Sequence, residues 1–335
     1  MNQPEGHDLS FDELHDPRIE ATDFERISTR RLSRRALLGA AGAMGAAAFV
    51  SGAGTLLPCA TRAMGHSHAL EFSPIPTNTL DTITVPEGFS WHVVASWGDP
   101  LWSSGVAFDQ ATRGTGASQE TAFGDNNDGM SLFVSGGRSI LAVNNEYVNR
   151  TIIYGNRVTR LPETVDDVQK GKAGHGVSVF EITEIKGFWR VVKDSPFNRR
   201  ITADTPIALT GPARGHTMLR TAADPSGTMS LGTWNNCGNG KTPWGTYLAC
   251  EENFNGYFSS SDENVAITPA MKRYGVRTRD WGYAWGQVDE RFDISKHPNE
   301  INRAGYIVEI DPLDPTSTPK KRTALGRFKH ENAEV

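Results

Sequence analysis

Short apolar runs bounded by turn residues constrain the fold of this chain more than any other feature of its sequence. From residue 68 onward, glycine, proline and polar residues interrupt every apolar run after a few positions. No long stretch of this region repeats apolar residues every 3.6 positions, as an amphipathic helix requires. The chain contains 34 glycines and 18 prolines, enough for many tight turns. These features predict an all-β fold.

Turn signals join several of these runs into hairpins. Gly136-Gly137 separates one pair of runs, and Lys186-Gly187 separates a second. A glycine-rich loop is expected over 235–245, and the polar segment 161–172 is expected to form a loop or a short helix. The expected strands cover residues 91–95, 131–134, 139–143, 176–182, 188–192, 228–234, 246–250, 305–310 and 323–328.

Similar strands recur at wide spacing along the chain. Residues 179–182 and 307–310 have similar sequences, and a basic segment follows each of them. Repeated hairpins of this kind favour a β-propeller. The sequence ends soon after the last expected strand, whereas a propeller closes on itself to protect its sheet edges. We therefore expect a β-propeller that is incomplete in this chain.

The first 63 residues have the composition of an export signal. Arg30-Arg31 precedes an apolar run over 36–50 that is rich in glycine and alanine, as in the bacterial twin-arginine signal. A short transmembrane anchor is the alternative, but the run is shorter than the ~20 apolar residues that a span needs. Cleavage near Ala63 would leave residues 64–335 without stable membrane insertion. We expect the twin-arginine export machinery as a partner and a periplasmic or secreted location.

Charge and missing motifs argue against several classes of function. Lys and Arg number 34 against 39 Asp and Glu, a net charge of −5, which argues against a nucleic-acid partner. The sequence has no Gly-x-Ser-x-Gly, Walker or His-Glu-x-x-His motif. Serine hydrolases of the first type, P-loop ATPases and zincins therefore lack support.

Acidic residues gather in three segments at the ends of expected strands, namely 144–147, 234–253 and 326–331. In a propeller such strand ends converge, and converging carboxylates repel one another unless metal ions neutralise them. Carboxylate oxygens favour Ca²⁺ or Mg²⁺, and an added thiolate brings iron or zinc into range. Each acidic residue taken singly, Glu146 and Glu331 included, is also compatible with a solvated surface carboxylate.

Cys237 and Cys250 allow two interpretations. In an oxidising compartment a disulfide between them is the default expectation. Alternatively, Cys237 binds a metal as a thiolate that the backbone N–H groups of its glycine-rich loop stabilise. Glu251 and Glu252 are consecutive, so in an extended strand only one of them faces a common site. The segment 125–129 resembles a calcium loop but lacks the required spacing, and we interpret it as a turn.

The middle acidic segment resembles a known family, the PhoX family of bacterial alkaline phosphatases. The similar motifs are Asn236-Cys237, 242–246 and 250–253, with 145–147 and His330-Glu331 on either side in the order of that family. The resemblance implies a monomeric β-propeller over 64–335 that acts on small phosphomonoesters as a phosphoric monoester hydrolase. It also implies Fe³⁺ and Ca²⁺ as cofactors. Protein groups would position the substrate rather than react with it, so no catalytic side chain is assigned.

The resemblance also implies a set of metal ligands. Cys237 is similar to the iron-binding thiolate of the family, and Glu331 to a carboxylate shared between iron and calcium. Glu146 and either Glu251 or Glu252 are similar to further metal carboxylates, and Glu252 is favoured by its parity along the strand. A disulfide is disfavoured if Cys237 binds iron.

Departures from the family pattern leave alternatives open. The family is longer than this chain, and its Arg-Pro-Glu-Gly motif and later acidic ligands do not occur in residues 1–335. The chain is therefore expected to be an N-terminal portion whose activity by itself is left open. A non-catalytic secreted calcium-binding propeller is one alternative. Another metal-dependent esterase, such as a phosphodiesterase, is the second.

Overall fold

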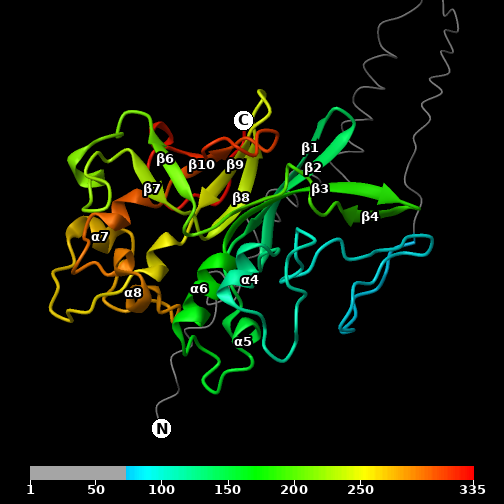
Figure 1. The fold of residues 1–335 in the computed structure, drawn as a ribbon, viewed down its shortest axis with the longest axis horizontal. Helices are drawn as coiled ribbons and strands as arrows, with labels where there is room; N and C mark the ends of the chain where they lie inside the picture. Colours follow the sequence, from blue (N-terminus) through cyan, green and yellow to red (C-terminus); the bar gives the residue numbers. More distant parts are fainter. Residues whose placement is uncertain (1–72) are drawn as a thin grey trace, which may run out of the picture. The chain divides into compact units, whose positions relative to one another are not determined.

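The computed structural model describes residues 73–335, and the expected export segment 1–63 lies outside the described residues. The chain divides into two compact units, Met1–Trp91 and His92–Val335. Residues 73–91, the described part of the first unit, form no helix or strand. All the described helices and strands belong to the second unit (Figure 1). No helix within 73–335 is both long and apolar enough to cross a membrane.

Five antiparallel strands form the first sheet. The order is β1-β2-β3-β4, and β5 pairs with β3 beside β4. The turns at Gly136-Gly137 and Lys186-Gly187 have positive φ at both residues, the geometry of two-residue hairpins whose twist matches that of the strands. Both hairpins predicted from these dipeptides are confirmed. The strands are β1 (Asn127–Ser135), β2 (Arg138–Asn145), β3 (Gly176–Ile185), β4 (Phe188–Val191) and β5 (Arg199–Ile201).

Six strands form the second sheet, in the order β7-β6-β11-β10-β9-β8. Strands β11 and β6 run parallel, and all other neighbours in this sheet are antiparallel. The strands are β6 (Pro206–Thr210), β7 (Met229–Leu231), β8 (Asn236–Lys241), β9 (Tyr247–Glu251), β10 (Ile307–Ile310) and β11 (Lys320–Arg322).

The glycine-rich segment around Cys237 is a strand, so the prediction of a loop over 235–245 is wrong for its first half. Strand β8 pairs with β9, and its glycines lie where other backbone segments approach closely. A Cβ at Gly238 would lie 2.8 Å from the Glu331 carbonyl oxygen, and a Cβ at Gly240 would lie 2.4 Å from the Ala333 carbonyl oxygen. These glycines therefore admit a neighbouring chain rather than form a turn.

Two expected strands are also wrong. Residues 91–95 form no strand. The partner of β10 is β11, which precedes the expected 323–328, because the chain turns into the 3₁₀ helix η5 (Thr323–Leu325) and then reaches Gly326 at φ 88°. A positive φ at this position ends extended pairing.

The helices within 73–335 are short, and the longest of them, α6 (Val165–Gly174), has ten residues. It occupies the polar segment that was expected to form a loop or a short helix. A capping box fixes its start, because the Thr164 and Asp167 side chains accept each other's backbone N–H groups. Figure 1 shows the helices gathered at one end of the sheets. The others are α4 (Gly116–Glu120), α5 (Arg150–Ile153), α7 (Pro269–Arg273), α8 (Trp285–Val288), η1 (Thr217–Leu219), η2 (Phe254–Tyr257), η3 (Glu290–Phe292) and η4 (Glu300–Arg303).

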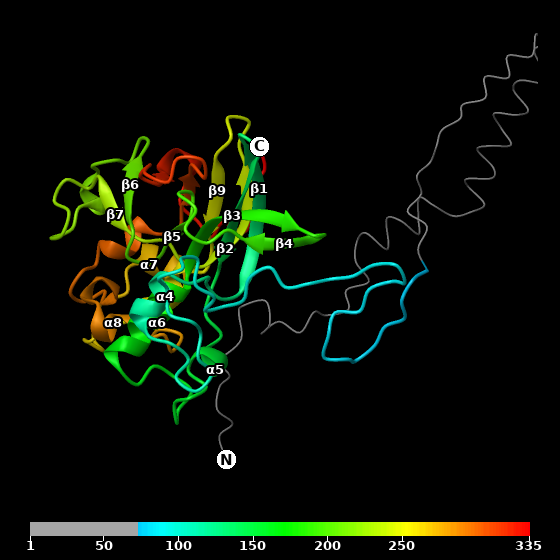
Figure 2. The same cartoon turned by 45° about the vertical axis from the view of Figure 1, so that its right-hand side comes forward.

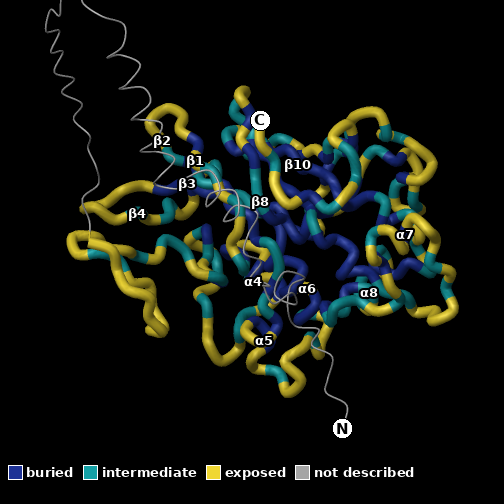
Figure 3. Tube along the Cα trace, turned by 180° about the vertical axis from the view of Figure 1, so that it is seen from behind, coloured by how far each residue is buried: buried dark blue, intermediate teal, exposed yellow. Residues whose placement is uncertain are grey.

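The two sheets share a buried core. Phe133 and Val179 of the first sheet pack in one cluster with Tyr247 and Val308 of the second. Figure 3 shows the buried residues concentrated where the sheets meet. The described residues thus form a β-rich fold with short helices, and the described strands do not close into a barrel. The β-rich part of the all-β prediction is confirmed.

Candidate metal centre

The ends of strands β2 and β9, the beginning of β8 and the C-terminal segment lie next to one another. Glu146 follows β2, Glu252 follows β9, and Cys237 lies within β8. The Gly238 N–H donates a 2.7 Å hydrogen bond to the Glu331 carbonyl oxygen, which holds the C-terminal segment against β8. In both Figure 1 and Figure 2 the C-terminal end lies beside β9. The pairing of sheet edges therefore brings together residues that are far apart in the sequence.

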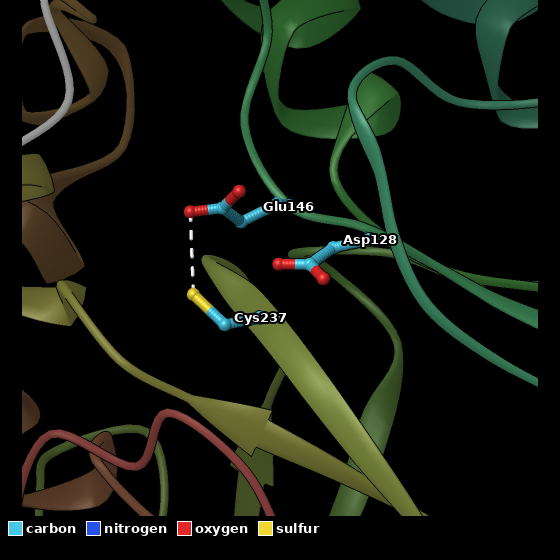
Figure 4. A group of neighbouring side chains, drawn as sticks. All are labelled: Asp128, Glu146 and Cys237. Atoms are coloured by element: carbon cyan, nitrogen blue, oxygen red, sulfur yellow. Dashed lines mark hydrogen bonds between the residues drawn. The ribbon is translucent and has the colours of Figure 1, made fainter. Parts of the chain in front are cut away.

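Cys237 is shared by two groups of candidate metal ligands. The first group consists of Asp128, Glu146 and Cys237, and the second of Cys237, Glu252 and Glu331. Within each group the ligand atoms all lie within 4.8 Å of one another. Figure 4 shows the first group, with both carboxylates directed toward the space above the thiol.

The thiol of Cys237 lies between two carboxylates. Its Sγ is 3.3 Å from Glu146 Oε1 and 3.4 Å from Glu252 Oε2. A single S–H proton cannot satisfy both oxygens at once. Cys237 is buried, while Glu252 is partly buried and Glu331 is exposed. The centre thus opens to solvent on the side of Glu331.

Burial and crowding of negative charge disfavour the ionised forms of these groups. Burial above all raises the pKa of Glu146 to about 8, and the neighbouring Asp128, Glu252 and Glu331 carboxylates add to the effect. Burial likewise raises the pKa of the Cys237 thiol far above its ordinary value, helped by Glu146 and Glu252. In the metal-free protein, burial and then these carboxylates therefore favour the Cys237 thiol over the thiolate, and the binding of a metal by a Cys237 thiolate stays a prediction.

This donor set fits bound cations. A thiol and four carboxylates converge where each ionised group destabilises the others, and a cation would reverse that balance. The thiolate suits a transition metal and the carboxylates suit a hard cation such as Ca²⁺.

Comparison with known proteins identifies the family. The sequence model described as alkaline phosphatase PhoX matches residues 70–335. The chain belongs to the PhoX family. Among solved structures it is similar to Pseudomonas fluorescens PhoX in complex with vanadate, a transition state analogue, with 52% sequence identity and a TM-score of 0.75. The match covers 78% of this chain and 45% of that one, so this chain spans less than half of the solved PhoX. No curated protein matches the chain.

Glu251 lies apart from the residues that this PhoX-family chain brings together. Its carboxylate accepts hydrogen bonds from the backbone N–H groups of Gly305 and Tyr306 at 2.8 and 3.0 Å. It also pairs with Lys321 Nζ at 2.8 Å, and neither side chain is exposed. Because successive side chains of a strand alternate, Glu251 points into this ion pair while Glu252 lies beside Cys237.

The structure does not contain the disulfide that an oxidising compartment suggested. Cys237 and Cys250 are both buried as free thiols. Cys250 packs in a small apolar cluster with Leu248 and Ile307, and it belongs to neither candidate ligand group. Cys250 is therefore a core residue of this PhoX-family fold.

Asp128 is the candidate ligand that sequence reasoning missed. It lies in the segment 125–129, which we interpreted as a turn, but residues from Asn127 onward belong to β1. Gly129 allows this strand to approach β8, because a Cβ there would lie 2.7 Å from the backbone N of Asn239. The high density of acidic and amide residues in 125–129 could have indicated a metal ligand, but their spacing does not match that of a calcium loop.

The raised pKa of Glu146 predicts how pH affects the metal-free protein. Because its folded pKa of about 8 lies above its ordinary value of 4.5, the folded chain binds this proton more tightly than the unfolded chain does. Glu146 therefore stabilises the fold least at high pH. Relative to Glu146→Gln, the unfolding free energy should fall on the order of 1 kcal/mol per pH unit between about 4.5 and 8.

Urea unfolding of both proteins in chelator, at pH 5 and pH 8, measures this difference. Using the glutamine variant as the reference cancels titration elsewhere, for example that of buried His175. If the difference in unfolding free energy between the two proteins is the same at both pH values, the raised pKa of Glu146 is contradicted.

Proposed function

We propose that this chain carries the metal centre of a metal-dependent alkaline phosphatase that hydrolyses small phosphomonoesters. The observation that carries the proposal is the convergence of Cys237 with four carboxylates from separate segments. Such a cluster is costly to bury unless cations neutralise it. Membership of the PhoX family supports the same reading.

We assign Fe³⁺ to the thiol side of the centre and Ca²⁺ to the carboxylates. Cys237 is the only soft donor among the five candidate ligands, so the transition metal belongs there. Glu331, an exposed member of the second group, is assigned as the carboxylate shared between the two kinds of ion, as its similarity to the family's shared carboxylate implies. When bound, these cations would neutralise the ester oxygens of a substrate and the charge that develops on the transferring phosphoryl group.

The side chains of this chain have a positioning role in that scheme. Burial of Cys237 keeps water away from the thiol side, and the exposed Glu331 and Asp128 face the side from which a substrate enters. Vanadate is an oxyanion that acts as a transition state analogue in its complex with the similar Pseudomonas fluorescens protein. That complex supports phosphoryl transfer as the chemistry of this centre. No protein nucleophile is required.

We also propose the wider setting of the centre. The two sheets are blades of a β-propeller, and the ligand groups line the side on which their strand ends meet. The Arg30-Arg31 signal directs the folded protein to the periplasm or the exterior. Because that route carries folded proteins, the metals are held before export.

Hydrolysis of p-nitrophenyl phosphate by the purified protein tests the proposed function. We expect turnover that falls to background after chelation and returns on addition of Ca²⁺ and iron. Bis-p-nitrophenyl phosphate provides the diester comparison. Full turnover in a thoroughly metal-free preparation would refute the scheme. Preference for the diester would indicate a phosphodiesterase, and metal binding without hydrolysis of either ester would indicate a non-catalytic binder.

A further inference from the structure

Asn235 lies next to both candidate ligand groups without belonging to either. It is buried, with 4% of its surface exposed, and its φ of 50° is in the left-handed region. Asparagine and glycine adopt this conformation more readily than other residues. A residue held in this conformation two positions before Cys237 sets the direction in which β8 begins.

The backbone of Asn235 ties the ends of two strands together. Its N–H donates to the Glu146 carbonyl oxygen at 3.0 Å, and its carbonyl oxygen accepts from the Glu252 N–H at 2.9 Å. Glu146 belongs to the first ligand group and Glu252 to the second. One residue therefore spaces the backbones of two candidate ligands that lie on either side of Cys237.

The side chain of Asn235 makes a second set of links to the same two groups. Its Nδ2 lies 3.4 Å from Glu146 Oε1, a direct contact with the first group. Its Oδ1 accepts from the Asn253 N–H. The Asn253 side chain in turn donates to Glu252 Oε2, which reaches the second group.

The Asn235 side-chain amide also contacts a buried aromatic cluster. Asn235 Nδ2 also lies 3.4 Å from the Tyr257 hydroxyl, which is 3.0 Å from His175 Nε2. Tyr257 and His175 are fully buried, and both rings pack against Trp285. The amide is therefore held by groups that have little freedom to move.

We propose that Asn235 is a positioning residue that fixes Glu146 and Glu252 at the correct separation around Cys237, and so sets the affinity of the centre for its cations. The inference rests on the proposed function, because it requires that the two ligand groups bind metal. Hydrogen-bond partners that orient metal ligands commonly change affinity by about 10- to 100-fold when they are removed. We expect a loss in that range.

Substitution Asn235→Gly isolates the side chain, because glycine tolerates the left-handed φ and keeps both backbone hydrogen bonds. The matched control is Asn198→Gly. Asn198 is also buried, accepts one backbone N–H from Glu181, and donates two hydrogen bonds, to the carbonyl oxygens of Leu101 and Val192. Both variants lose a similar buried amide, but only Asn235 contacts the ligand groups.

Titration of the metal-free proteins with Co²⁺, followed by the thiolate-to-cobalt charge-transfer absorption, provides the readout. The band should require Cys237, and Asn235→Gly should weaken Co²⁺ binding about 10- to 100-fold while Asn198→Gly binds as the unsubstituted chain does. Equal affinities for Asn235→Gly and the unsubstituted chain would overturn the inference alone. Absence of a Cys237-dependent band in the unsubstituted chain would overturn the proposed metal centre as well.

A second variant keeps the test decisive if Asn235→Gly does not fold. Tyr257→Phe keeps the packed ring but removes the hydroxyl that holds Asn235 Nδ2. It should weaken Co²⁺ binding severalfold and shift the charge-transfer band, since the amide is then less constrained. Affinity and spectrum identical to those of the unsubstituted chain would overturn the proposal.

Discussion

Substitution Cys237→Ser is expected to abolish binding of the transition metal, with a loss of affinity greater than about 100-fold. Cys237 is the one residue common to both ligand groups, so its loss opens both of them. A serine hydroxyl ionises far less readily than a thiol and offers a hard oxygen in place of a polarizable sulfur. The effect should exceed the 10- to 100-fold cost of losing a residue that only orients a ligand.

Elemental analysis of the purified variant, together with loss of charge-transfer absorption, measures this effect. The matched control is Cys250→Ser, which removes the second buried thiol of the same sheet. Cys250 packs against Leu248 and Ile307 and belongs to neither ligand group, so that variant should keep its metal while losing some stability. Iron at unchanged stoichiometry in Cys237→Ser, or equal losses in both variants, would contradict the assignment of the thiol.

Substitution Lys321→Met should destabilise the protein by about 3–5 kcal/mol, the cost of leaving one member of a buried ion pair alone. Lys321 Nζ lies 2.8 Å from Glu251 Oε1, and neither side chain is exposed to solvent. Methionine keeps the length of the apolar stem, so the change removes charge with little change in packing. The Glu251 carboxylate would then keep only the N–H groups of Gly305 and Tyr306.

Urea unfolding of the metal-free protein measures that loss. The double variant Lys321→Met, Glu251→Gln should recover much of it, because the neutral amide no longer leaves an unpaired charge. The surface pair Lys296–Glu290, which is largely exposed, provides the contrast, and Lys296→Met should cost far less than Lys321→Met, because solvent screens an exposed ion pair. A cost for Lys321→Met as small as that of Lys296→Met would show that water reaches Glu251.

The pattern of turn residues and apolar runs in the sequence predicted those parts of the site that depend on residues close together in the chain. Glu146 lies at the end of β2 because the Gly136-Gly137 turn fixes the register of the hairpin, and both features are readable from the sequence. The opposite directions of Glu251 and Glu252 also follow from local geometry, because successive side chains alternate along a strand. The assignment of metals to these residues stays a prediction.

The remainder could not be predicted because it depends on approaches between distant segments. Glycine in a sequence indicates a turn or a close contact equally well, and in β8 Gly238 and Gly240 serve close contact. Asp128 was missed for the related reason that Gly129 brings β1 against β8, which no short-range spacing reveals. The role of Asn235 likewise arises from partners that lie up to 89 positions away.

The glycine contacts of β8 have a consequence for when the centre can form during biosynthesis. Glu331 joins Cys237 only after the segment around Glu331 has docked against β8, and closing such a long loop is slow compared with local hairpin formation. A cation that binds all the segments at once stabilises only the finished topology, by about 2.7 kcal/mol at a concentration of 100 Kd. Metal occupancy would then report that the chain has been synthesised through Glu331 and that its ligand-bearing segments have folded together, a state that a shorter nascent chain or a misfolded polypeptide does not reach.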